Sequence, residues 1–184
     1  GTGFMFFTFS GNDAACAASL KVLEILDSSH AQEALAAAKL KASGVECPFT
    51  TSWQTWTQLE SFSTWHNTLF ATQNNGFGGT GARLAFNSPL HVRHIENLAN
   101  MAKQGLFVYK GRGNAADATF VSGECAMATA TSALYGSIKR NSKFASGIST
   151  LPYYPDVPGA PQNTVIGGAS LWVMSGKPAA EYKG

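Results

Sequence analysis

The sequence has little net charge and no long apolar run. Lys and Arg exceed Asp and Glu by only 13 to 11 over 184 residues, and they are scattered, which argues against nucleic acid or a membrane surface as a partner. The longest apolar stretches, such as 3–9 and 165–174, are shorter than the roughly 20 residues that cross a bilayer. No secretory signal stands at Gly1, so we expect a chain that is either cytosolic or already processed.

Cysteine is also scarce. Only Cys16, Cys47 and Cys125 are present, and none of them lies in a CxxC or His/Cys pattern, which argues against a structural zinc site. Cys47 and Cys125 each lie beside a short apolar run, a placement that suits neighbouring strand ends in one core. Two buried thiols and a disulfide are both compatible with that placement. Cys16, in an Ala-rich helical stretch, is expected to be a buried thiol.

Patterns that signal catalysis or metal binding are missing as well. The Ser, His and Asp residues form no Gly-x-Ser-x-Gly motif, so hydrolase chemistry has no support. His91 and His94 stand at i and i+3 of a predicted helix, where two imidazoles can share a metal, but they lack the acidic neighbour of an HExxH motif. We therefore predict a solvated helix face there, with no metal, no catalytic residue and no cofactor.

What the sequence does contain is enough apolar surface for a core. With 45% hydrophobic residues over 184 positions, we expect a single domain or lobe spanning 1–184. Apolar periodicity and turn residues predict strands that alternate with helices, which favours an α/β fold with a mixed, largely parallel sheet flanked by helices. The predicted strands are 4–9, 125–129, 144–151 and 164–175, and predicted helices cover 13–26, 53–65, 115–121 and 132–140.

Two further helices are delimited by the residues at their ends. For the first, Ser29 and Gln32 form a possible capping box and Gly44 stands in the C′ position. For the second, Ser88 serves as N-cap, followed by Pro89, and Gly105 comes after the end. The inward face of the second helix is predicted from its apolar residues, Val92, Ile95, Leu98 and Ala102.

Segment 53–65 repeats apolar residues at helical spacing, and we expect most of that stripe to be core. Its members are Trp53, Trp56, Leu59, Phe62 and Trp65. Between the helices, 73–81 is rich in Asn and Gly and predicts an exposed loop, 152–161 predicts a Pro-rich loop, and Gly-Arg-Gly at 111–113 predicts a basic turn.

Residues 159–174 form the most informative motif, Gly-Ala-Pro-Gln-Asn-Thr-Val-Ile-Gly-Gly-Ala-Ser-Leu-Trp-Val-Met. A Pro-led turn leads into an apolar strand that is interrupted by Gly167 and Gly168. Glycines inside such a run give up side-chain packing and conformational entropy. Room for a ligand against bare backbone amides is one common compensation, and a β-bulge is the alternative.

Together with Trp53-Gln-Thr-Trp56 and Gly123-Glu-Cys-Ala-Met127, this motif resembles the periplasmic sn-glycerol-3-phosphate-binding proteins of ABC importers, from about residue 40 to 184. The resemblance implies a non-enzymatic solute-binding protein in the periplasm, with sn-glycerol-3-phosphate or a glycerophosphodiester as ligand and a membrane permease as partner. It also implies one lobe of a two-lobed, type 2 periplasmic-binding-protein fold, in which hinge closure buries the ligand. Several of the family's other cleft contacts have no counterpart in this chain.

The same resemblance implies four ligand-binding residues. Thr131 occupies the place of a ligand-binding Ser, between a predicted strand and a helix whose first amides suit an anion; an ordinary N-cap is the alternative. Gly168 matches a glycine whose amide meets the ligand. Trp53 and Trp56 match paired tryptophans of the cleft, where an indole packs on glycerol carbons; Trp56 is the preferred contact, and one of the two is open to a purely core role.

A periplasmic location also bears on the cysteines. In that oxidising compartment we favour a disulfide between Cys47 and Cys125, worth roughly 4 kcal/mol by loop-closure entropy.

Residues 7–27 show a weaker resemblance, to a segment of class III pyridoxal-phosphate aminotransferases. It rests on Phe7-Thr-Phe-Ser-Gly-Asn12 and would place Thr8 near a cofactor phosphate. Asp13 stands where that family usually has Pro, and the region with the cofactor lysine is missing, so no transamination is expected. A composite chain would be joined near residues 28–40. Alternative interpretations are therefore an engineered or recombined structural domain without ligand function, or an aminotransferase fragment.

Overall fold

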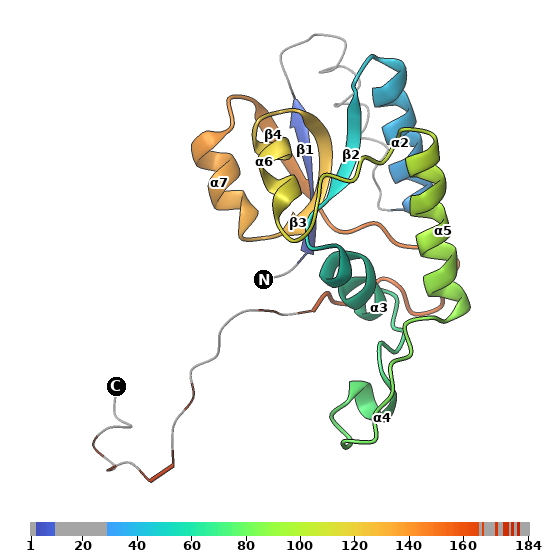
Figure 1. Cartoon of the computed structure of the whole chain (residues 1–184), viewed down its shortest axis with the longest axis vertical. Helices are drawn as coiled ribbons and strands as arrows, with labels where there is room; N and C mark the ends of the chain where they lie inside the picture. The colour runs from blue at the N-terminus through green and yellow to red at the C-terminus, as the bar shows by residue number, and fades with distance from the viewer. Residues whose placement is uncertain are drawn as a thin grey trace.

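A four-stranded mixed sheet forms the centre of the protein. The computed structural model describes the backbone of residues 3–9 and, in full, 29–165, 167, 172, 175, 176, 178 and 180. The strands, β1 (Gly3–Phe9), β2 (Cys47–Thr51), β3 (Cys125–Thr131) and β4 (Ala145–Ser149), lie in the order β2-β3-β1-β4 (Figure 1). β2 and β3 are parallel, whereas β1 runs antiparallel to both β3 and β4. The predicted α/β class with a mixed sheet is confirmed, but the sheet is not largely parallel, because β1 inserts between β3 and β4 in the opposite direction.

Helices cover both faces of this sheet. α2 (His30–Ala42) and α5 (Pro89–Lys103) lie on one face, and α6 (Ala115–Val121) and α7 (Leu134–Asn141) lie on the other (Figure 1). Phe49 and Met127, both fully buried, belong to the core under α2 and α5. Ala128 and Phe120 belong to a second core beneath α6 and α7. The two cores exist because successive β3 side chains point to opposite faces of the sheet.

The predicted disulfide between Cys47 and Cys125 is confirmed. These residues are opposite one another at the first positions of β2 and β3, with their Cα atoms 4.6 Å apart. The bond joins residues separated by 78 positions, so it removes a long loop from the unfolded ensemble. Cys16 lies outside the described residues.

Helix ends agree with their capping residues. Ser29 caps α2 in a complete capping box with Gln32, and Gly44 follows in a left-handed conformation, φ +88°. Ser88 is the N-cap of α5, Pro89 begins it, and Gly105 follows with φ +68°. Both helices therefore begin and end at the predicted residues, although only Ser29 makes a side-chain capping bond, whereas the Ser88 hydroxyl bonds His91.

The predicted inward face of α5, in contrast, is confirmed for Leu98, which is buried, and wrong for its other three members. Val92 and Ile95 are 47% and 44% exposed, and Ala102 is exposed too. The buried face consists of His91, His94, Leu98 and Met101. The histidines take the inner positions because polar partners inside the protein bond both ring nitrogens of His91 and Nε2 of His94. The prediction that His91 and His94 form a solvated face is wrong.

The segment after β2 also differs from a regular helix. It contains a π-helical turn, η1 (Trp56–Glu60), followed by α3 (Ser61–Trp65). Trp53 precedes the helix in a left-handed conformation, φ +51°, and is 44% exposed. Because Trp53 lies before the helix and outside its regular spacing, the predicted core stripe holds for Phe62 but not for Trp53.

Outside these elements the chain is mostly irregular. The predicted loop 73–81 is exposed, and it includes part of a short turn, α4 (Thr72–Asn75). The described residues of 164–175, which are Thr164, Val165, Gly167, Trp172 and Ser175, are not in a strand, contrary to prediction. Gly168 lies outside the described residues. Among the helices of the described part of the chain, none is both long and apolar enough to cross a membrane.

Candidate functional site

The two parallel strands end side by side and open onto a cavity. Thr51, at the end of β2, is paired with Thr129, two residues before the end of β3. In α/β sheets, ligands bind outside the carboxyl ends of parallel strands. A cavity of about 670 Å³, lined mostly by α6, α7 and the residues that flank them, reaches these strand ends through Trp53 and Thr131. Its other lining residues are Asn114, Asp117, Ala118, Val121, Ser122, Ala133, Leu134, Ser137 and Asn141.

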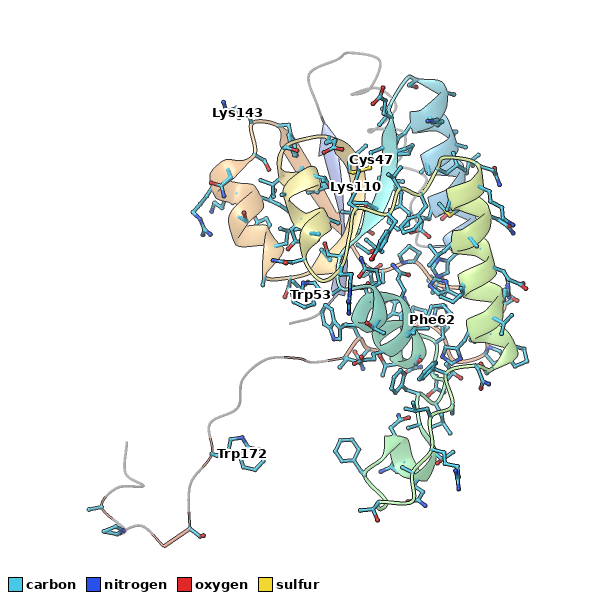
Figure 2. All side chains as sticks on the ribbon, viewed as in Figure 1. Cys47, Trp53, Phe62, Lys110, Lys143 and Trp172 are labelled. Atoms are coloured by element: carbon cyan, nitrogen blue, oxygen red, sulfur yellow. A yellow bond between two sulfur atoms is a disulfide. The ribbon has the colours of Figure 1, made fainter. Side chains whose placement is uncertain are left out.

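A tight turn after β2 places Trp53 on this cavity (Figure 2). The Trp53 N–H donates to the Gly113 carbonyl at 2.7 Å, and the Trp53 carbonyl accepts from the Thr57 N–H at 2.8 Å. Gly113 itself has φ +56°, a conformation that favours glycine. The turn at 111–113 thus supports the indole, and its sequence shows only a basic turn, without this role.

Thr131 reaches the cavity from the last position of β3. Its hydroxyl oxygen accepts from the Ala133 N–H at 3.3 Å, where the chain turns into α7. A hydroxyl that accepts one bond can still donate its own proton. The N-terminal end of α7, which carries a partial positive charge, begins immediately beyond, at Leu134.

A carboxyl group is the one ionisable group on the described wall of this cavity. Asp117 accepts a hydrogen bond from the Ser52 hydroxyl. Burial raises the pKa of Asp117, while the bond from Ser52 opposes that rise. The described wall therefore offers carboxyl, hydroxyl, amide and indole groups but no cationic side chain, which suits hydroxyl donors and carbon surface better than a phosphate dianion.

Trp56 and Gly168 are not placed with the other two candidates. Trp56 lies in η1, is partly buried, and does not line the cavity. Gly168 lies outside the described residues. The structure thus brings together Trp53 and Thr131, and Trp53 rather than Trp56 is the tryptophan on their shared cavity.

Sequence reasoning missed a cluster of buried imidazoles at α2, α3 and α5, outside the wall of this cavity. His30, His66, His91 and His94 come from α2, the end of α3 and α5, and all are at most 5% exposed. Burial lowers the pKa of His66 to about 4, lowers that of His91, and lowers that of His94 well below its usual value. No group of three or more potential ligands in the described part of the chain could hold a metal ion. Ser88, three residues before His91, is a signal in the sequence that a buried His91 can find a hydrogen-bond partner. The second partner, Ser63, is brought to His91 only by the fold.

The comparisons with known proteins agree that this chain resembles solute-binding proteins. Residues 12–184 match the model of a family described as bacterial extracellular solute-binding protein. The sn-glycerol-3-phosphate-binding periplasmic protein UgpB of Pectobacterium atrosepticum is 50% identical over 147 residues, which cover 80% of this chain and 33% of that protein. Proteins of the same name from Yersinia pestis and Salmonella typhimurium are each 49% identical over 147 residues, 80% of this chain and 34% of theirs.

The chain thus spans about a third of the length of the curated relatives it matches. The family match begins at residue 12 and overlaps most of 7–27. None of these matches supports the resemblance of that segment to aminotransferases.

Proposed function

The chain belongs to the bacterial extracellular solute-binding protein family, and we propose that it is part of the binding component of an ABC importer for sn-glycerol-3-phosphate or glycerophosphodiesters. The observation that carries the proposal is the placement of Trp53 and Thr131 on one cavity at the carboxyl ends of β2 and β3. Relatives at about 50% identity are named for sn-glycerol-3-phosphate and for the periplasm. The disulfide between Cys47 and Cys125 suits that oxidising compartment.

Different groups on the cavity wall suit different parts of the ligand. The Trp53 indole face suits the glycerol carbons, and its N–H can donate to an oxygen. The Asp117 carboxyl and the Thr131 hydroxyl suit the glycerol hydroxyls. The N-terminal end of α7 favours the anion, with the Gly168 amide and Trp56 as further contacts that the family resemblance implies.

A second lobe is needed to complete the site. Because no described residue on the cavity wall is cationic, the phosphate requires positive partners from the remainder of the full-length protein. Charge-assisted hydrogen bonds contribute about 1.5–3 kcal/mol each, so their loss removes most of the affinity. We propose that this chain forms one lobe of a two-lobed, type 2 binding protein that closes around the ligand and delivers it to a membrane permease without catalysis.

Calorimetry on the full-length protein tests this proposal. Trp53→Ala and Thr131→Ala should each weaken the binding of sn-glycerol-3-phosphate by about tenfold or more, or at least 1.4 kcal/mol. Tyr109→Ala is the matched control, because Tyr109 is an exposed aromatic residue that does not line the cavity. Unchanged affinity in both cavity variants would contradict the site, and absence of binding by the parent protein would contradict the ligand.

A further inference from the structure

A continuous chain of buried hydrogen bonds connects α5 to the end of the two parallel strands. His94 Nε2 lies 2.9 Å from the side-chain oxygen of Gln58, in η1. The amide nitrogen of Gln58 donates to the hydroxyls of Thr51 and Thr129, at 3.0 and 2.9 Å. One side chain therefore ties together a helix, a π-helical turn and both strands.

From the strands the chain continues to the turn that contains Trp53. The Thr129 hydroxyl donates to the Thr51 hydroxyl at 2.7 Å, and the hydroxyls of Thr51 and Thr57 are 3.0 Å apart. The Thr57 hydroxyl donates to the Ser52 carbonyl at 2.9 Å and lies 3.2 Å from the Trp53 carbonyl. The network therefore ends on the backbone that sets the direction of the indole.

The hydrogen bonds from His94 through Gln58 to the two threonines each have a defined donor and acceptor. Because the Gln58 amide uses both of its protons on the threonines, its oxygen must accept from His94 Nε2, which fixes the Nε2–H tautomer. His94 Nδ1 is then an unprotonated acceptor, and it has no hydrogen-bond partner among the described residues. Burial keeps the pKa of His94 well below its usual value, so the ring remains a neutral donor to Gln58.

The turn needs such support because its conformation is unfavourable. Trp53 has φ +51°, a region that bulky residues rarely adopt and that costs about 1–3 kcal/mol. Gln58 lies in a π-helical turn, a feature that occurs frequently at functional sites. A relaxed turn would carry the indole away from the cavity.

We propose that Gln58, held by His94, is a positioning residue that keeps the backbone of Ser52 and Trp53 in the conformation that presents the indole to the cavity. The ligand that the indole contacts rests on the proposed function. The positioning itself is a property of this chain and can be measured without any ligand.

The first experiment follows the indole N–H resonances of the chain by NMR. Gln58→Met keeps the volume of the side chain but removes every hydrogen bond, so the Trp53 resonance, assigned with Trp53→Phe, should shift. The far-ultraviolet circular dichroism spectrum should report an intact fold by staying unchanged; the Trp65 indole is no such reporter, because Trp65 lines the same small cavity as Gln58. An unmoved Trp53 resonance in Gln58→Met would overturn the proposal.

A second variant and a control distinguish a local change at Trp53 from a general loss of stability. Thr57→Val removes the last step of the network at nearly constant shape and should shift the same resonance, which keeps the test decisive if Gln58→Met does not fold. His91→Gln is the matched control, since His91 is equally buried on α5 but bonds Ser63 and Ser88 instead of the network. A Trp53 shift as large in His91→Gln as in Thr57→Val would also overturn positioning by Gln58.

The second experiment measures affinity for sn-glycerol-3-phosphate in the full-length protein. Gln58→Met should weaken binding about tenfold, and adding it to Trp53→Ala should cause no further loss, because both act through the same side chain. Additive losses would overturn positioning through Trp53. If the parent protein binds no glycerol phosphate, the proposed function fails, while the NMR experiment still decides the positioning.

Discussion

His30 and His94 lie with their ring centroids 4.8 Å apart inside the protein. Phe62 stacks on His94 at 4.0 Å and contacts His66 at 4.1 Å. It also lies within 6.0 Å of the other two imidazoles, so it forms the centre of the cluster. Glu33 is the carboxylate in contact with the cluster, 3.0 Å from His30 Nδ1. Two protonated imidazoles at such spacing in a low-dielectric interior would repel strongly, so protonation of further rings destabilises the cluster.

Acid should therefore destabilise the protein through His66. Its Nε2 accepts from the Tyr154 N–H at 2.9 Å, so protonation of Nε2 breaks a buried hydrogen bond. The pKa of His66 falls from 6.5 to about 4, mainly because the ring is buried. Between these values the unfolded state binds the proton and the folded state does not, so the stabilisation is complete above pH 6.5 and is lost as pH falls toward 4.

For His66 alone this amounts to about 3 kcal/mol. Urea unfolding at several pH values checks the effect, and His66→Gln, which cannot titrate, should show a smaller loss of unfolding free energy over the same range. The comparison is needed because other charged or titratable groups lie against the cluster, namely Glu33, Arg93, Tyr154 and Asp156. Equal pH dependence in the two proteins would refute the assignment to His66.

Phe62 should be among the residues that contribute most to stability. It is 4% exposed and separates the imidazoles, so Phe62→Ala should cost about 3–5 kcal/mol of unfolding free energy. Phe77→Ala serves as control, because Phe77 is 90% exposed and should change stability by less than about 0.5 kcal/mol. Similar unfolding midpoints for the two variants would argue against the buried cluster.

Reduction of the disulfide should also destabilise the protein. The Cys47–Cys125 bond closes a separation of 78 residues, which corresponds to about 4 kcal/mol of unfolding free energy. Denaturant unfolding with and without a reductant measures this difference, and Cys47→Ala should reproduce the effect of the reductant. Peptide mapping of the oxidised protein should find Cys16 as the alkylatable thiol; free Cys47 and Cys125 would contradict the bond.

The sequence predicted those features that depend on local chemistry. Ser29 and Gln32 specify the start of α2, because a capping box satisfies amides within one turn. In α5, the positions of Ser88 and Pro89 fixed the first turn, but aliphatic residues were a poor guide to its inner face. Burial of His94 is possible because Gln58, 36 positions away, accepts a hydrogen bond from its Nε2–H, and that partner is defined only by the tertiary fold.

The remaining errors concern long-range pairing and backbone conformation. Nothing in the sequence of β1 shows that it pairs with both β3 and β4, since strand order depends on contacts between distant segments. The left-handed turn at Trp53 is equally hidden, because spacing alone indicates a continuous helix. A family resemblance is enough to identify Thr131 and Trp53 as candidate contacts, whereas the network through Gln58 is defined only by the fold.

This chain alone should bind sn-glycerol-3-phosphate too weakly for calorimetry, whereas the full-length protein should bind it well. The described wall of the cavity has no cationic side chain and contains Asp117, so the phosphate lacks the charge-assisted hydrogen bonds that give affinity. Hydrogen bonds to the anion are stronger when the ligand is removed from water, and a separate lobe cannot enclose the ligand in this way. Titration of both proteins under the same buffer and salt conditions makes the comparison direct, and equal affinity would show that residues of this chain suffice to hold the anion.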